Sequence, residues 1–142
     1  MRFMMTFRGT EEYENGAMPS EESITAMTAL MGEMAAQGVL LGGDGLHPSS
    51  KAVRLELREG KQRVVDGPFT ETKELIAGYC LIQVDSKEEA IEWASRCLVA
   101  DQGNSAGIDL RQIFEADDFG DAYTPEARAI SEQATAQAEL NK

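Results

Sequence analysis

The chain has 142 residues, of which 13 are basic and 25 acidic, and its formal charge is −12. This length is typical of one globular domain that buries a core without disulfides or a structural metal. The acidic balance, with no run of basic residues, argues against nucleic-acid binding. The apolar runs are too short for a signal peptide or a membrane span, and Cys80 and Cys97 lie in apolar surroundings. We therefore expect a cytoplasmic protein with reduced cysteines.

The first third of the chain predicts a strand, a helix and a short second strand. Residues 2–8 alternate between apolar and other side chains, which is the period of a strand. Ser20 is a candidate cap for a helix that ends at Gly38. Its core-facing stripe comprises Ile24, Met27, Met31, Met34 and Ala35. Residues 39–41 are a short strand candidate that leads into the turn-rich segment 42–48.

The middle of the chain predicts a β-hairpin. Val53, Leu55 and Leu57 alternate with charged residues, as in a half-exposed strand. Glu59 and Gly60 form a two-residue turn, and residues 61–66 return as the partner strand. In this register the numbers of opposite residues add up to 119, so Val53 faces Asp66.

A strand, a helix and a last strand follow. Residues 77–84 are apolar at nearly every position. Ser86 and Glu89 form a capping box that opens a helix. The side chains that we expect this helix to bury are Ala90, Ile91, Ala94, Cys97 and Leu98. Residues 107–114 complete the series as a strand.

This order of elements predicts an α+β fold, a ferredoxin-like split βαβ antiparallel sheet with both helices on one face, over residues 1–115. The other sheet face, to which we assign Met4, Cys80 and Ile82, then needs a cover, and a second copy of the chain is the simplest one. We expect a homodimer in which the two sheets face each other. Residues 116–142 form an acidic tail rich in Ala, Glu and Gln, with a helix opened by Thr124 and Pro125. That helix either docks on the partner subunit or frays in solution.

The hairpin brings two polar loops to the same end, residues 45–51 and residues 66–73. They contain the only histidine, His47, and the carboxylate of Asp66. A carboxylate beside an imidazole is a common acid/base pair, because it fixes the tautomer of the ring. The structural alternative is that Asp66 accepts hydrogen bonds from the turn ahead of Pro68, while His47 is an ordinary loop residue. One histidine without spaced ligands is too few for a metal site, and no cofactor fingerprint is present, so we expect neither metal nor cofactor.

Four segments of the sequence resemble the YCII-related family, in its DGPF-motif branch. They are LGGDGLHPSSK at 41–51, VDGPFTETKE at 65–74, AGY at 77–79 and AIEWA at 90–94. The resemblance covers about residues 1–115 and implies a dimeric α+β barrel. It also implies an active-site histidine and aspartate in a cleft near the dimer interface, which map onto His47 and Asp66. The tail lies outside the usual family pattern.

Three functional hypotheses follow. In the first, the protein is an enzyme acting on a small polar or cyclic metabolite, in which His47 transfers protons and Asp66 orients it. The residues that would surround that ligand are Ser49, Lys51, Phe69, Thr70, Lys73 and Tyr79. In the second, the protein is a non-catalytic ligand-binding or regulatory module that uses the same cleft for a ligand or its acidic surface for a basic protein partner. An accessory of an extracytoplasmic-function sigma factor is an example that the family resemblance suggests. In the third, the Gly-Pro turn is purely architectural.

Overall fold

The structure is a computed structural model that describes residues 1–69 and 75–141. The chain divides into two compact units, Met1–Gln112 and Ile113–Lys142, which are described separately.

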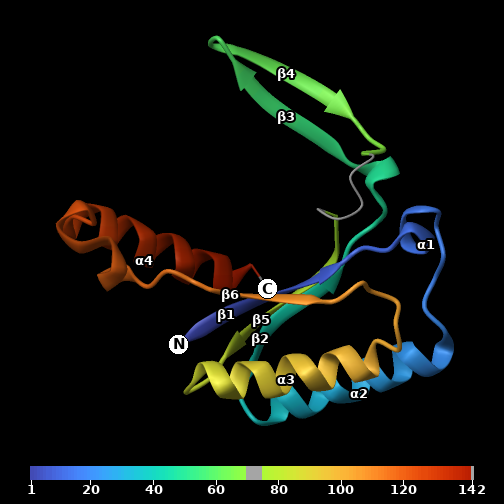
Figure 1. Ribbon diagram of the computed structural model, residues 1–142. Helices are drawn as coiled ribbons and strands as arrows, with labels where there is room; N and C mark the ends of the chain where they lie inside the picture. Colours follow the sequence, from blue (N-terminus) through green and yellow to red (C-terminus); the bar gives the residue numbers. More distant parts are fainter. Residues whose placement is uncertain (70–74, 142) are drawn as a thin grey trace. The chain divides into compact units, whose positions relative to one another are not determined.

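The first unit contains a four-stranded antiparallel sheet (Figure 1). Its strands, in spatial order, are β2 (Leu40–Gly45), β5 (Ile76–Gln83), β1 (Arg2–Arg8) and β6 (Ile108–Gln112). The two central strands are β1 and β5, the first and third strands of this sheet along the chain. This arrangement is the split βαβ topology of the ferredoxin-like fold. The predicted fold class is therefore confirmed, whereas the homodimer stays a prediction.

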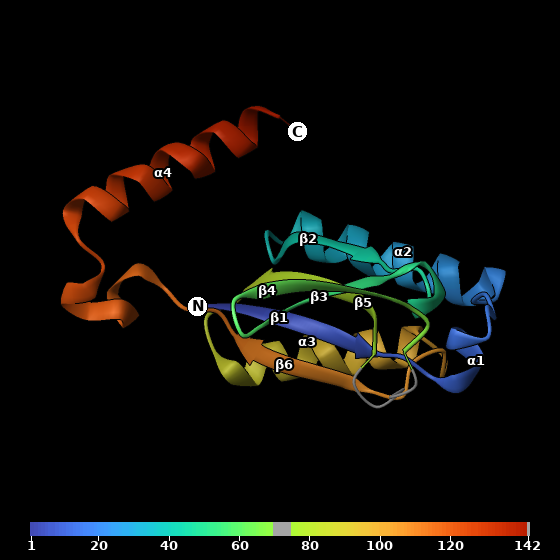
Figure 2. The same ribbon diagram turned by 90° about the horizontal axis from the view of Figure 1, so that it is seen from above.

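Helices α2 (Glu21–Ala36) and α3 (Lys87–Ala100) lie on the same side of the sheet (Figures 1 and 2). Ser20 caps α2 by accepting a hydrogen bond from the Ser23 amide at 3.1 Å. After the helix, Gly38 adopts a φ of +73°, a conformation that suits glycine, and its amide donates to the Ala35 carbonyl. Both predicted ends of this helix are confirmed to within two residues.

The core lies between the sheet and these helices. Met5, Met34 and Ile82 are fully buried at its centre. Cys80 is opposite Met5 and Ile82 is opposite Phe3, so both face the helices. Assigning Cys80 and Ile82 to the open sheet face was wrong, because the β5 residues that share that face with Met4 are Tyr79 and Leu81.

Helix α3 differs from its predicted packing by a rotation about its axis. Ser86 caps it by accepting a hydrogen bond from the Glu89 amide at 3.1 Å, as expected. The Glu89 carboxylate accepts instead from Asp85, one residue before the predicted position. Of the five side chains expected in the core, Ala90, Ala94 and Cys97 are buried, whereas Ile91 and Leu98 are 46% and 44% exposed, and Trp93 is buried beside the first three.

Strand β2 is longer than predicted, because the glycines assigned to a turn continue the strand to Gly45. A Cβ atom at Gly43 would lie 2.6 Å from the Tyr79 carbonyl oxygen. Glycine at this position therefore lets β2 approach β5 closely enough to pair with it.

The strands β3 (Val53–Arg58) and β4 (Lys61–Asp66) form a separate two-stranded ribbon (Figure 1). Their register is the predicted one, with Val53 opposite Asp66 and Arg58 opposite Lys61. Glu59 and Gly60 both have positive φ angles, +50° and +75°, as in the type I′ turn that joins short hairpins. The apolar side chains of β3, predicted to form the covered side of a half-exposed strand, are themselves exposed, by 51% at Val53, 60% at Leu55 and 75% at Leu57.

In the first unit, two short elements were not predicted from the sequence, namely α1 (Glu11–Glu14), capped by Thr10, and the 3-10 turn η1 (Ser49–Lys51). In the second unit, the 3-10 segment η3 (Ala116–Ala122) precedes α4 (Pro125–Leu140). Thr124 caps α4 as predicted, and no residue of α4 is buried. Phe114, expected in the last strand, stacks on Phe119 with a centroid distance of 5.1 Å. None of the helices in the described residues is long and apolar enough to cross a membrane.

Candidate functional site

The two polar loops meet at Ser49. This residue is 4% exposed, and its hydroxyl accepts a hydrogen bond from the Phe69 amide at 2.8 Å. Nearby, the Gly67 amide donates to the Ala52 carbonyl at 2.8 Å. The sequence prediction that the segments around His47 and Asp66 converge is therefore confirmed at the level of the backbone.

Glycine is required at position 67 by this convergence. A Cβ atom built on Gly67 would lie 1.7 Å from the Ser49 carbonyl oxygen, which is far inside van der Waals contact. The Gly67–Pro68 peptide bond that follows is cis. The Asp-Gly-Pro-Phe sequence thus forms a turn whose backbone is in close contact with the loop of residues 45–51.

Glu14, at the end of α1, holds the same serine from the opposite side. Its two carboxylate oxygens accept hydrogen bonds from the Ser49 amide at 2.8 Å and from the Ser49 hydroxyl at 2.5 Å. Sequence analysis missed Glu14, because it lies 35 positions before Ser49 and within a run of acidic residues that gives no local signal. In this arrangement Ser49 ties the loops together, and its contact with a ligand stays a prediction.

His47 and Asp66 lie on the two sides of this junction. His47 is two residues before Ser49, and Asp66 directly precedes Gly67. Both residues are exposed, and among the described residues neither forms a hydrogen bond or an ion pair. The structure thus brings their backbone segments together and leaves both side chains accessible to solvent.

The two aromatic residues predicted to surround a ligand, Phe69 and Tyr79, make different contacts. The Phe69 ring is half-buried beneath the Arg54 guanidinium, whose central carbon lies 4.2 Å from the ring centroid. Tyr79 lies on the open face of the sheet, and its hydroxyl donates to Asp44 at 3.2 Å. The hydrogen bond to Asp44, followed by the negative charge of that carboxylate, raises the pKa of Tyr79.

A second tyrosine connects the His47 loop to α1. The Tyr13 hydroxyl donates to the Leu46 carbonyl at 2.7 Å, and the Leu46 amide donates to Ala77 of β5 at 2.8 Å. Burial, followed by the charge of Glu14, raises the pKa of Tyr13. These bonds fix the residue before His47 between α1 and the sheet.

The remaining predicted residues add little to this geometry. Lys51 is exposed at the end of η1. Thr70 and Lys73 lie outside the described residues. No group of histidine, cysteine and acidic side chains that could hold a metal occurs within the described part of the chain. The expectation that the protein uses neither metal nor cofactor therefore stays a prediction.

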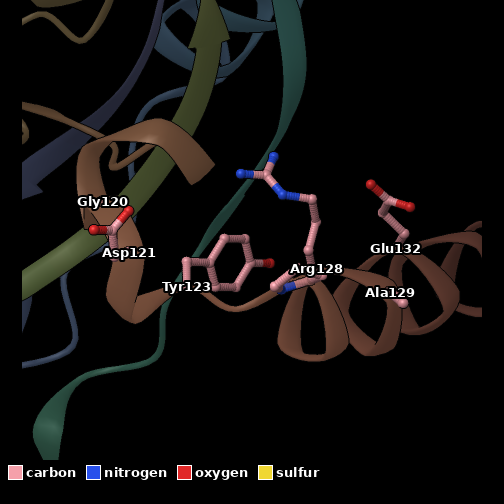
Figure 3. A pocket seen from close by; sticks show the side chains of 7 residues that line it. Gly120, Asp121, Tyr123, Arg128, Ala129 and Glu132 are labelled. Atoms are coloured by element: carbon pink, nitrogen blue, oxygen red, sulfur yellow. The ribbon is translucent and has the colours of Figure 1, made fainter.

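The second unit has a hollow of its own of about 500 Å³ (Figure 3). Arg128 projects from α4 beside the Tyr123 ring, 5.2 Å from the centroid, and pairs with Asp117 at 3.4 Å. Asp121 and Glu132 also line the hollow, and it contains none of the site residues predicted from the sequence. The candidate site is thus at the Ser49 junction.

Three comparisons with known proteins bear on this chain. Residues 1–117 match the model of the YCII-related domain. The uncharacterized protein R00369 of Rhizobium meliloti (strain 1021) is 43% identical over 49 residues, which are 34% of this chain and 40% of that protein. A solved structure of 5-chloro-2-hydroxyhydroquinone dehydrochlorinase from Burkholderia phenoliruptrix AC1100, in complex with 2,5-dihydroxybenzoquinone, is similar with a TM-score of 0.47 and 13% identity. That likeness covers 81% of this chain and 95% of the other.

Proposed function

The chain belongs to the YCII-related family, and from this premise and the converging loops we propose that it binds a small polar or cyclic molecule between His47 and Asp66. The observation that supports the proposal most strongly is the Ser49 junction, in which one buried serine joins the two loops that carry these side chains. Such a junction fixes the backbone beneath the site, which reduces the entropy lost when a ligand binds.

The chemistry proposed for this site is proton transfer. In the bound state His47 gives a proton to the ligand or takes one from it, while the Asp66 carboxylate holds the ring in one tautomer. Phe69 and Tyr79 provide apolar contact, and Lys51 favours a ligand that carries negative charge. The reaction class is therefore general acid/base catalysis on a small molecule.

A second function, binding without catalysis, is favoured by one observation. His47 and Asp66 form no hydrogen bond with each other in the described structure, so the pair is not assembled in the chain alone. A ligand-binding or regulatory protein needs the same two loops but no acid/base pair. The two functions differ in whether Asp66 acts on the imidazole of His47.

A screen by NMR tests the proposed site. Because His47 is the only histidine, its imidazole gives a single set of signals, which report binding directly. Mixtures of small carboxylic acids, phenols and cyclic ketones serve as probes. We expect a binder to shift the imidazole signals and the Phe69 amide, and Asp66→Asn to weaken its binding by about tenfold, the loss of roughly one charged hydrogen bond.

Asp85→Asn is the matched control, because Asp85 is an exposed aspartate in the loop before α3. It should leave binding unchanged. Binding that shifts only residues of the hollow in the second unit would contradict the proposal. Turnover of a binder by the wild-type protein but not by His47→Gln would establish catalysis, whereas binding without turnover would favour the second function.

A further inference from the structure

The outer side of β4, one edge of the hairpin of residues 53–66, has no neighbouring strand in the described part of the chain. The hairpin is a ribbon of two strands that is not hydrogen-bonded into the main sheet (Figure 1). Every second residue of an antiparallel edge strand directs its amide and carbonyl groups outward. The pairing with β3 runs without a shift from Lys61 to Asp66, so no bulge interrupts this edge. Such an edge is a template for another extended segment.

The two faces of the hairpin differ in chemistry. Directly opposed residues of an antiparallel pair lie on the same face. One face is apolar, and its exposed aliphatic side chains are Val53, Leu55, Leu57 and Val64. The other face is mainly basic, and its charged side chains are Arg54, Glu56, Arg58, Lys61 and Arg63. A segment added to β4 therefore extends an apolar surface on one side and a basic surface on the other.

Two of the cations on the basic face have no partner among the described residues. The Glu56 carboxylate pairs with Arg58 at 3.3 Å, and the guanidinium of Arg54 lies over an aromatic ring. By contrast, Lys61 and Arg63 are exposed and form neither an ion pair nor a hydrogen bond with a described residue. They are alternate residues of one strand, so their side chains leave the backbone about 6.8 Å apart. The unpaired positive charge thus lies along β4.

We propose that β4 accepts an extended segment of another protein in which acidic and apolar residues alternate. Alternate side chains of a strand point to opposite faces. Such a segment therefore places its carboxylates beside Lys61 and Arg63 and its aliphatic side chains beside Val64. Opposite charges directly across two strands stabilise the pairing, whereas like charges oppose it. Backbone hydrogen bonds supply the affinity, and the alternation supplies the specificity.

Charge disfavours two other occupants of this edge. A second β4 strand would bring cations of the two strands together on one face. A long polyanion such as a nucleic acid would also approach the rest of the molecule. The hairpin carries four basic and three acidic side chains, a net charge of +1, so the rest of the chain carries −13 and repels a polyanion. A short acidic strand touches the hairpin alone and avoids this repulsion.

Binding of synthetic peptides tests this inference without any ligand of the candidate site. The probe is a short peptide in which glutamate and valine alternate, and the control peptide has the same composition with its glutamates grouped together. We expect the alternating peptide to bind the full-length protein with a dissociation constant below about 1 mM, and the control peptide to bind at least about tenfold more weakly. NMR titration measures both. Binding should weaken as the salt concentration rises.

Lys61→Glu tests the role of the cations on β4. The new carboxylate lies opposite Arg58, so the hairpin keeps a favourable cross-strand pair and a loss of binding does not arise from a loosened hairpin. Lys87→Glu is the matched control, because it makes the same charge change at an exposed position of α3. We expect Lys61→Glu to weaken binding of the alternating peptide by about fivefold or more, and Lys87→Glu by less than about twofold.

Hydrogen exchange distinguishes strand pairing from simple charge attraction. The bound peptide should slow the exchange of amides in residues 61–66, which a contact through side chains alone would not do. The inference would be overturned by a peptide that does not bind, by an unaffected Lys61 variant, by an equal loss in the Lys87 control, or by binding without added protection. Tighter binding of a single-stranded oligonucleotide at the same salt concentration would assign the cations to phosphates instead. Protection of the outward amides of β4 in the protein alone would show that a second copy occupies the edge.

Discussion

Single residues at the Ser49 junction account for the shape of the candidate site. Gly67 has no side chain, so its backbone can approach the Ser49 carbonyl closely. The Ser49 hydroxyl donates a hydrogen bond to Glu14 and accepts one from the Phe69 amide. These roles are structural, so one function of the Asp-Gly-Pro-Phe sequence is to hold the two loops together. That finding agrees with the third hypothesis for Gly67 and Pro68, while His47 and Asp66 remain accessible for chemistry.

Replacing Gly67 by alanine should destabilise the fold. The new methyl group would overlap the Ser49 carbonyl, so the two loops must separate, and overpacking of this kind costs about 1–3 kcal/mol of the free energy of unfolding. Urea denaturation measures the change. Gly32→Ala is the control, because nothing lies within 4 Å of its Cβ position in α2, and it should stabilise the protein by about 0.5–1 kcal/mol. A Gly67→Ala protein as stable as the wild type would show that the loops do not meet.

The Tyr79–Asp44 hydrogen bond predicts a shift in a tyrosine titration. Asp44→Asn removes the charge and weakens the bond that raises the pKa of Tyr79, so this pKa should fall toward its ordinary value near 10. Absorbance of tyrosinate as a function of pH measures it, and Tyr79→Phe identifies the signal among the three tyrosines. The control Asp109→Asn changes a carboxylate that lies on the same sheet face but does not contact Tyr79. An equal shift in both variants would contradict the assigned bond.

At the scale of elements, the Glu14–Ser49 contact joins α1 to η1. Ser49→Ala leaves the Phe69 amide and the Glu14 carboxylate without a shared partner, and we expect a loss of about 1–3 kcal/mol of stability. Glu14→Gln should also destabilise the protein, and the double variant should cost less than the two losses added, because each removes the same contact. Denaturant unfolding of all four proteins measures the coupling. Additive losses would show that the two residues act separately, and the exposed neighbour Ser50 provides a control as Ser50→Ala.

Elements with local signals were predictable from the sequence. The cap at Ser20, the glycine after α2 and the turn at Glu59 and Gly60 act within a few residues, so their chemistry is visible in a short stretch of sequence. The hairpin register then followed from the turn alone, and it placed Val53 opposite Asp66 correctly.

Features that depend on contacts between distant segments were not predictable. Gly43 is a strand residue only because β5 lies against it, and the rotation of α3 depends on which side of the helix accommodates Trp93. The Glu14–Ser49 contact is invisible for the same reason. Of the candidate site, the meeting of the loops could be predicted, while the residues that hold them together could not.

At the scale of the whole molecule, the two cysteines predict how stability depends on alkaline pH. Burial raises the pKa of Cys80 to about 12 and that of Cys97 to about 11. In the unfolded chain both thiols ionise near pH 9, so above that pH unfolding releases protons that the fold retains. The free energy of unfolding contributed by these thiols is complete below about pH 9 and is lost as the pH rises toward 11 and 12.

Denaturant unfolding between pH 8 and 10.5 measures this dependence. A variant with Cys80→Ala and Cys97→Ala should show a flatter profile than the wild type, because lysine and tyrosine titrations are common to both proteins. Parallel profiles would contradict the burial of the thiols. The same burial predicts that neither thiol reacts with a disulfide reagent in the native state at neutral pH, and that both react in denaturant.

The central claim is that His47 and Asp66 belong to one site, and the tautomer of the single imidazole tests it most directly. Long-range ¹H–¹⁵N spectra distinguish the two neutral tautomers by the shifts of the ring nitrogens. In the wild-type protein with a binder from the NMR screen present, we expect one tautomer to dominate, because a carboxylate beside one nitrogen fixes the proton there. Asp66→Asn should produce a mixture of tautomers, while Asp85→Asn should not. A wild-type spectrum that Asp66→Asn leaves unchanged would show that the aspartate does not act on the histidine.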